Sequence, residues 1–178
     1  MEKVSYSQIV ADLQAIIQRE HYPRKAILHR GQTVCDHLFF IESGVVRTFY
    51  YRDGKDITAH IATDYGAITA IDSFIQRKRS RYTIEVLEDS QLIKIHYYDL
   101  YQLLEKNPAL ERTIRIFLEH VYIDLAERIE GLLFHTARER YEHLLAQNPA
   151  IIQRVDLKHI ASYLGISQET LSRVRANQ

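Results

Sequence analysis

The sequence predicts an α+β protein: an N-terminal antiparallel β-roll of the jelly-roll type with flanking helices, a long helix, and a C-terminal unit of short helices. Three observations support this fold class. Between residues 24 and 95, short stretches of alternating apolar residues are separated by turn residues. From Pro108 to Leu133, apolar residues instead recur every three or four positions, with no proline inside the pattern. Two short helical patterns separated by Gly165 complete the sequence.

Length and composition limit the class of protein. The 178 residues allow one large or two small domains. There is no run of about 18 apolar residues that could form a membrane helix, and the N-terminal stretch MEKVSYSQIVADLQ is charged and amphipathic, unlike a secretory signal. Cys35 is the single cysteine, which excludes an internal disulfide and a site with several cysteine ligands. We therefore expect a cytoplasmic protein with no membrane segment.

The N-terminal part is predicted to contain one helix and a set of short strands. Ser7–Arg19 has the spacing of an amphipathic helix, which ends before Pro23. Asp53-Gly54 lies between two β-rich stretches and predicts a tight hairpin. Ala67–Phe74 is predicted as a short helix, and the basic run Gln76–Arg81 is either a solvated loop or a functional segment. The predicted strands are Lys25–His29, His37–Ile41, Val45–Arg52, Lys55–Ala62, Tyr82–Leu87 and Gln91–Ile95.

The next segment predicts an unusually long helix. Asn107 and Pro108 form a typical helix start, and a helix from Pro108 to Leu133 would be roughly 39 Å long. It could lie across the roll as a core helix. The interpretation we favour is that a second apolar stripe pairs with the same helix of another subunit. The residues predicted for this dimer interface are Ile114, Phe117, Val121 and Leu125.

Two further helical patterns follow a short break. Gly131–His135 is predicted to be a hinge, and Ala137–Gln147 a helix. In the last two dozen residues, the second short helix begins at Ser167, and its apolar side is only two or three residues wide. Its polar side begins Gln-Glu-x-x-x-Arg, which suits the major groove of DNA better than a protein core. From Arg154 onward there are only two more positive than negative residues. Dimerisation would therefore have to strengthen any DNA binding.

This order of parts resembles the CRP/FNR superfamily of bacterial transcription regulators over nearly the whole chain, and most closely its short members from Bacteroidetes-type bacteria. The residues that carry the resemblance are Phe39-Phe40-Ile41-x-x-Gly44, the run from Ile84 to Ser90, Arg140-Tyr141, and Ile160-Ala161-x-x-Leu164-Gly165-Ile166-Ser167-x-Glu169-Thr170-Leu171-Ser172-Arg173. The resemblance implies an effector roll (1–107), a dimerisation helix with hinge (108–134) and a helix-turn-helix domain (135–178). Double-stranded DNA, a second copy of the chain and RNA polymerase are the implied partners.

The resemblance assigns the second short helix to base reading. The matching positions Gln168, Glu169 and Arg173 would face base edges, where arginine can bind guanine, glutamate cytosine and glutamine adenine. The hydroxyls of Ser167, Thr170 and Ser172 could donate to phosphates. We also expect Gly165 to turn the chain with positive φ and Ser167 to cap the helix. The alternative is that these side chains are exposed without binding anything.

The expected effector pocket departs from the pattern of the cyclic-nucleotide binders in this superfamily. Those proteins have a Gly-Glu pair that opens a short helix, followed by an Arg-Ser pair. Here Gly66 is followed by no carboxylate at the ribose position, and by residue count Asp72 comes too late. A cyclic nucleotide is therefore not the favoured ligand. The pocket would instead bind an unidentified small anion, or no ligand. The residues assigned to it are Gly66, Thr69, Ala70, Arg79, Ser80 and Arg81.

Two other functions are alternatives to the DNA-binding regulator. A sensor that acts through protein contacts, with a helix-turn-helix that no longer reads DNA, is motivated by the lack of a wing after Arg175. A cupin-like enzyme would need a metal cluster, but His29, His37 and His60 are scattered along the sequence. No nucleophile–base–acid pattern is evident, so we expect neither catalysis nor a metal site.

Overall fold

The computed structural model describes residues 11 and 13–176, and in this part of the chain eight strands form two four-stranded sheets. All strand pairs are antiparallel. The first sheet has the order β1 (Ile17–Tyr22), β8 (Ser90–His96), β3 (His37–Ser43), β6 (Ala67–Ile68). The second has the order β2 (Ile27–His29), β7 (Thr83–Val86), β4 (Val46–Arg52), β5 (Lys55–Ala62). The predicted roll is therefore confirmed.

One apolar core holds the two sheets together. Phe39 and Ile41 of β3 pack in the same buried cluster as Ile84 and Val86 of β7. These residues alternate with more exposed ones along their strands, because successive side chains of a strand point to opposite faces. The hairpin between β4 and β5 is also confirmed. Asp53 and Gly54 both have positive φ, as the tight turn requires.

The structure corrects two predicted helices. Residues 13–16 are helical, but 17–19 belong to β1, and residues 7–10 and 12 lie outside the described part. Ile17 pairs with Ile95 of β8, so strand pairing overrides the local helical spacing. Likewise, the predicted helix over 67–74 is a short strand, β6, followed by helix α2 (Ile71–Gln76), because Ala67–Ile68 pair with β3.

The C-terminal half is helical, largely as predicted. Asn107 caps α4, because its side chain accepts a hydrogen bond from the Leu110 amide (3.2 Å). The helix continues through Gly131, so the break falls at His135, the last residue of the predicted hinge. None of the described helices is long and apolar enough to cross a lipid bilayer. The helices are α3 (Tyr97–Lys106), α4 (Pro108–Phe134), α5 (Ala137–Gln147), α6 (Ile151–Arg154), α7 (Leu157–Tyr163) and α8 (Gln168–Ala176); α6 was not predicted.

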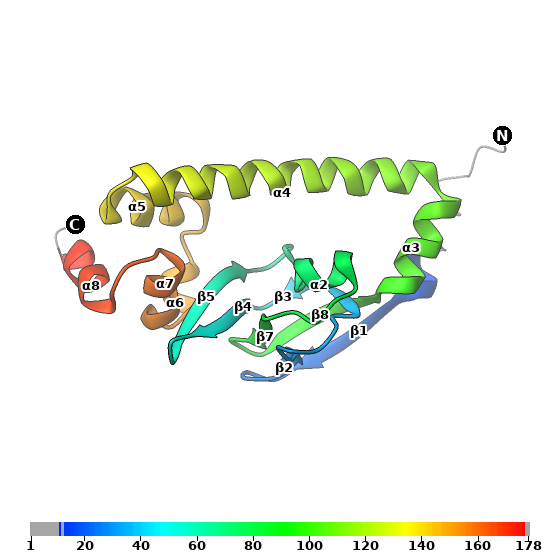
Figure 1. The fold of residues 1–178 in the computed structure, drawn as a ribbon, viewed down its shortest axis with the longest axis horizontal. Helices are drawn as coiled ribbons and strands as arrows, with labels where there is room; N and C mark the ends of the chain where they lie inside the picture. The colour runs from blue at the N-terminus through cyan, green and yellow to red at the C-terminus, as the bar shows by residue number, and fades with distance from the viewer. Residues whose placement is uncertain (1–10, 12, 177–178) are drawn as a thin grey trace.

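Figure 1 shows how these parts are arranged. Helix α4 runs along one side of the roll over most of the molecule's length, and α2 lies on the side of the roll that faces it. The chain turns back after α4, so that α6 and α7 lie next to β5 while α8 lies at the end of the molecule. In this view α7 lies between α8 and the strands of the roll.

Candidate nucleic-acid interface and effector pocket

The turn between α7 and α8 has the geometry expected of a helix-turn-helix. Gly165 has a φ of 69°, its amide donates to the Ser162 carbonyl (3.1 Å), and the Ile166 amide donates to the Ala161 carbonyl (3.0 Å). These bonds end α7 with the left-handed motif that glycine favours. A β-carbon at this position would also lie 3.2 Å from Cδ2 of Leu132. Both the conformation and the close packing against α4 therefore favour glycine.

A shared apolar core fixes the angle between the two helices. Ile160 and Leu171 are fully buried, and Ala161 of α7 is 2% exposed. The same cluster contains Tyr141 and Leu144 of α5. Burial of a large aliphatic side chain stabilises a fold by about 1.5–3 kcal/mol. The face of α8 opposite to this core is therefore held in a defined direction.

The opposite face of α8 presents the residues predicted to contact DNA. Ser167, Gln168, Glu169, Ser172 and Arg173 are exposed, and Thr170 is partly buried. Ser167 caps the helix as predicted, since its hydroxyl accepts from the Thr170 amide at 3.1 Å. The hydroxyls of Ser167 and Thr170 also lie 3.0 Å apart, so these two side chains help to build the helix start. DNA contact by any of these residues remains a prediction.

Helix α4 leaves a large apolar surface uncovered. Its buried residues are Leu110 and Gly131. Of the predicted interface residues, Ile114 is partly buried, whereas Phe117, Val121 and Leu125 are 40–50% exposed. An apolar surface of this extent commonly marks a protein–protein interface. A core helix would be covered by the roll, so this burial pattern favours pairing with another subunit. Other exposed apolar side chains of α4 are Ile116, Leu118, Tyr122, Ile123, Ile129, Leu132, Leu133 and Phe134.

The first segment of the candidate effector pocket leads into α2. Gly66 lies in a turn: its amide donates to the Thr63 carbonyl and its own carbonyl accepts from the Ile41 amide. The Thr69 hydroxyl donates to the His37 carbonyl at 2.9 Å. Ala70 is fully buried at the N-cap position of α2. Gly66 therefore does not open a helix, unlike the glycine of the pattern described above.

The second segment meets α2 through a polar contact that the sequence did not predict. Ser80 is buried, and its hydroxyl donates to Oδ1 of Asp72 at 2.8 Å. Asp72 reaches this position because α2 begins at Ile71, later than predicted, and so has Asp72 in its first turn. The start of α2, which was predicted at Ala67, is what brings Asp72 next to Ser80. That Asp72 comes too late in the chain for the ribose position of a cyclic nucleotide stays a prediction.

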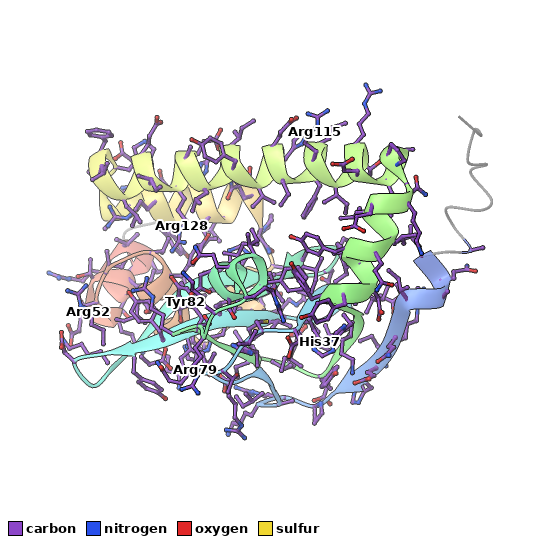
Figure 2. The ribbon with its side chains drawn as sticks, turned by 45° about the vertical axis from the view of Figure 1, so that its right-hand side comes forward. His37, Arg52, Arg79, Tyr82, Arg115 and Arg128 are labelled. Atoms are coloured by element: carbon purple, nitrogen blue, oxygen red, sulfur yellow. The ribbon has the colours of Figure 1, made fainter. Side chains whose placement is uncertain are left out.

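The two arginines of the second segment differ in their surroundings. The Arg81 guanidinium lies over the rings of Tyr50 and Tyr82, 4.6 and 5.0 Å from their centroids, and donates to the Tyr82 hydroxyl at 2.9 Å. Arg79 is exposed, and its backbone forms a bridge with Val34. Figure 2 shows Arg79 and Tyr82 on the roll and Arg115 and Arg128 along the long helix. The structure brings Ser80 and Asp72 together, while Arg81 contacts aromatic rings.

The helix-turn-helix unit is docked on the roll. Val45 and Ile61 of the roll belong to the same buried cluster as Ile160 and Leu171. The Thr58 amide of β5 donates to the Ser162 hydroxyl of α7 at 2.9 Å. The segments predicted as effector roll (1–107) and helix-turn-helix domain (135–178) therefore share a buried core.

The docking surface contains a buried histidine, for which we predict a pH dependence. His159 of α7 is 7% exposed, and burial, followed by the charge of Arg47, lowers its pKa below the usual value. The other charged groups that act on it are Asp56 and Glu85 of the roll and Lys158 of its own helix. In the unfolded chain, His159 has the ordinary pKa of about 6.5, so it binds a proton at a higher pH there than in the folded protein. The stability that neutral His159 contributes is therefore complete above a pH of about 6.5 and is lost as the pH falls below it.

Urea unfolding at pH values on either side of the ordinary histidine pKa of about 6.5 tests this prediction. The unfolding free energy of the His159→Gln variant should depend less on pH than that of the wild type. His120→Gln is the matched control, because His120 is exposed on α4. If all three proteins lose stability equally on acidification, His159 is not the group responsible.

Comparison with known proteins supports the same fold. Residues 19–107, half of the chain, match the model of the cyclic nucleotide-binding domain family. The chain is 24% identical over 124 residues to the anaerobic regulatory protein of Bacillus subtilis; the match covers 69% of this chain, which spans about half the length of that relative.

Several solved structures are similar over most of the chain. They include the c-di-GMP-responsive global regulator CLP of Xanthomonas campestris (TM-score 0.73, 19% identity, 96% of this chain and 90% of that one). FixK2 of Bradyrhizobium japonicum has a TM-score of 0.78 at 14% identity, covering 91% and 84% of the two chains. A CooA mutant of Carboxydothermus hydrogenoformans has a TM-score of 0.70 at 21% identity, covering 98% and 80%. At these identities the likeness establishes a shared fold.

Proposed function

The chain belongs to the cyclic nucleotide-binding domain family, and from this premise we propose that it is a sequence-specific DNA-binding transcription regulator of the CRP/FNR type. It acts in the cytoplasm as a homodimer, by binding and without catalysing a reaction. The observation that carries the proposal is the α7–α8 pair. A glycine turn and a buried core fix α8 so that Gln168, Glu169 and Arg173 project from its exposed side. The match to the anaerobic regulatory protein of Bacillus subtilis supports the same function.

Dimerisation gives the proposal its geometry. Two copies of α4 pair through Ile114, Phe117, Val121 and Leu125, so that two α8 helices reach successive major grooves about 34 Å apart. Arg173 then binds the O6 and N7 atoms of a guanine, as the chemistry of its guanidinium favours. Pairing also doubles the modest positive charge near α8, which contributes to attraction by phosphates.

Each predicted contact of α8 has a defined chemical task. Glu169 accepts a hydrogen bond from a cytosine amino group, and Gln168 pairs with an adenine. The hydroxyls of Ser167, Thr170 and Ser172 donate to phosphate oxygens, which fixes the register of the helix on the duplex. RNA polymerase is a further partner in this proposal.

The roll serves as the effector domain in this proposal. Its pocket comprises Gly66, Thr69 and Ala70 before α2, and Arg79, Ser80 and Arg81 before β7. The contact between Ser80 and Asp72 supports a site for a small polar ligand, because it places a hydroxyl and a carboxylate at one point of the roll. The arginines favour an anionic ligand. Cyclic AMP is not the ligand we propose.

Selection from a random-sequence duplex library tests the function. We expect enrichment of a motif with two half-sites about 10 base pairs apart, centre to centre. Binding to the selected duplex should weaken as salt increases, because phosphate contacts release counterions. A protein that remains dimeric but binds no duplex even at low salt would contradict DNA recognition. That result would favour the sensor that acts through protein contacts.

A further inference from the structure

Arg154, the last residue of α6, forms two ion pairs with the roll. Its guanidinium donates two hydrogen bonds to the Asp64 carboxylate, one of them 3.1 Å long from Nη2 to Oδ1. It also donates to Oε1 of Glu88, from Nη2 at 2.5 Å and from Nε at 3.1 Å. The Arg154 side chain is 23% exposed. These are charge-assisted bonds in a partly water-excluded site, so they are stronger than bonds between neutral groups.

The Asp64 carboxylate is held in place from both sides. The Gly44 amide donates to its Oδ1 at 2.7 Å, on the side of the roll. Hydrogen bonding by Arg154 is the main cause that keeps the pKa of Asp64 below its usual value, with the Gly44 amide acting in the same direction. Asp64 therefore stays ionised, and Arg154 keeps its partner, throughout the neutral pH range.

The positions of the two carboxylates in the chain connect them to the candidate pocket. Asp64 lies between β5 and Gly66, on the segment that continues into α2. Glu88 follows β7, on the segment that begins with Ser80. These two segments are joined at their other ends by the hydrogen bond between Ser80 and Asp72. Arg154 thus contacts both of the segments that carry the candidate pocket residues.

We propose that Arg154 is the positioning residue through which the pocket of the roll sets the orientation of the helix-turn-helix unit. A shift of either pocket segment moves a carboxylate, and the guanidinium can then no longer satisfy both partners in its fixed fork geometry. Arg154 is followed after two residues by α7, so such a shift acts directly on α7 and through it on α8. This coupling between the roll and α7 does not pass through α4 and does not require the break at His135. The inference rests on the proposed function for its biological meaning only.

Hydrogen exchange of the full-length protein, without DNA or effector, tests whether Arg154 holds the helix-turn-helix unit on the roll. In Arg154→Gln, the backbone amides of residues 156–163 and the amide of Thr58 should exchange about tenfold faster or more than in the wild type, because undocking exposes them. Arg138→Gln is the matched control. It removes an exposed pair with Glu142 within α5 and leaves the roll untouched. Unchanged exchange in Arg154→Gln would overturn the proposal.

A double-mutant cycle tests the connection to the pocket. Ser80→Ala removes the bond to Asp72 and should speed exchange in residues 156–163 when Arg154 is present. The same substitution should have little further effect in Arg154→Gln, because the connection is already broken. If Ser80→Ala does not fold, Asp72→Asn replaces it. Additive effects of the two substitutions would contradict coupling through Arg154. The exchange experiments contain no DNA, so they test the role of Arg154 separately from the proposed function. A protein that shows the coupling but binds no DNA would contradict the regulator proposal and not the inference about Arg154.

Discussion

Replacing Val121 by glutamate should convert the dimer into a monomer. In a paired α4, two copies of residue 121 face each other across the interface, and each glutamate would be buried without a partner. We expect dimerisation to weaken by roughly 4 kcal/mol or more, about a thousandfold in the dissociation constant. Sedimentation equilibrium measures this change directly. The roll should remain folded, because Val121 is not part of its core.

The matched control is His120→Glu. It introduces the same charge one residue earlier on α4, rotated by about 100° around the helix from the predicted interface. His120 is exposed, and this variant should remain dimeric. If Val121→Glu and His120→Glu sediment alike, the stripe of Ile114, Phe117, Val121 and Leu125 does not form the interface.

Replacing Arg173 by alanine should strongly weaken sequence-specific DNA binding. A bidentate arginine–guanine contact contributes roughly 1–3 kcal/mol, and a dimer makes it twice. We therefore expect a loss of roughly 30-fold or more in affinity for the selected duplex, with much less change for a random duplex. Fluorescence anisotropy with both duplexes measures the difference. Dimerisation should be unchanged, because Arg173 lies on α8, whereas the predicted dimer interface lies on α4.

Arg175→Ala is the matched control for this prediction. It removes an equal charge from the same helix, and Arg175 is also exposed. A phosphate contact at this position would weaken binding to both duplexes equally. If Arg173→Ala binds the selected duplex as tightly as the wild type does, α8 does not read bases through this residue. The alternative of a sensor with a degenerate helix-turn-helix would then be favoured.

Much of the fold could be predicted because its signals are local. The hairpin at Asp53-Gly54 follows from the positive φ that both turn residues adopt. The start of α4 follows from Asn107 and Pro108, and its length from an uninterrupted apolar period. Gly165 and the cap at Ser167 define the helix-turn-helix in the same way. In each case a few adjacent residues specify their own backbone conformation.

The errors occurred where distant strands decide the conformation. Ile17–Arg19 continue a helical pattern but pair with β8, some 75 residues later, and Ala67–Ile68 pair with β3. Sheet pairing satisfies backbone groups and buries side chains, which outweighs a weak local preference. The contact between Ser80 and Asp72 was not predicted for the same reason, because the start of α2 depends on where β6 ends.

The sequence by itself determined the order of parts: a roll, a long helix and a helix-turn-helix whose polar face suits DNA. Only the tertiary structure decided how these parts act on one another. It joined Ser80 to Asp72, and it brought Arg154 to Asp64 and Glu88, which lie 90 and 66 residues away in the chain. The physical reason is that a contact between charged side chains of distant segments leaves no periodic pattern in the sequence. Which of these side chains meet depends on the packing of the whole chain.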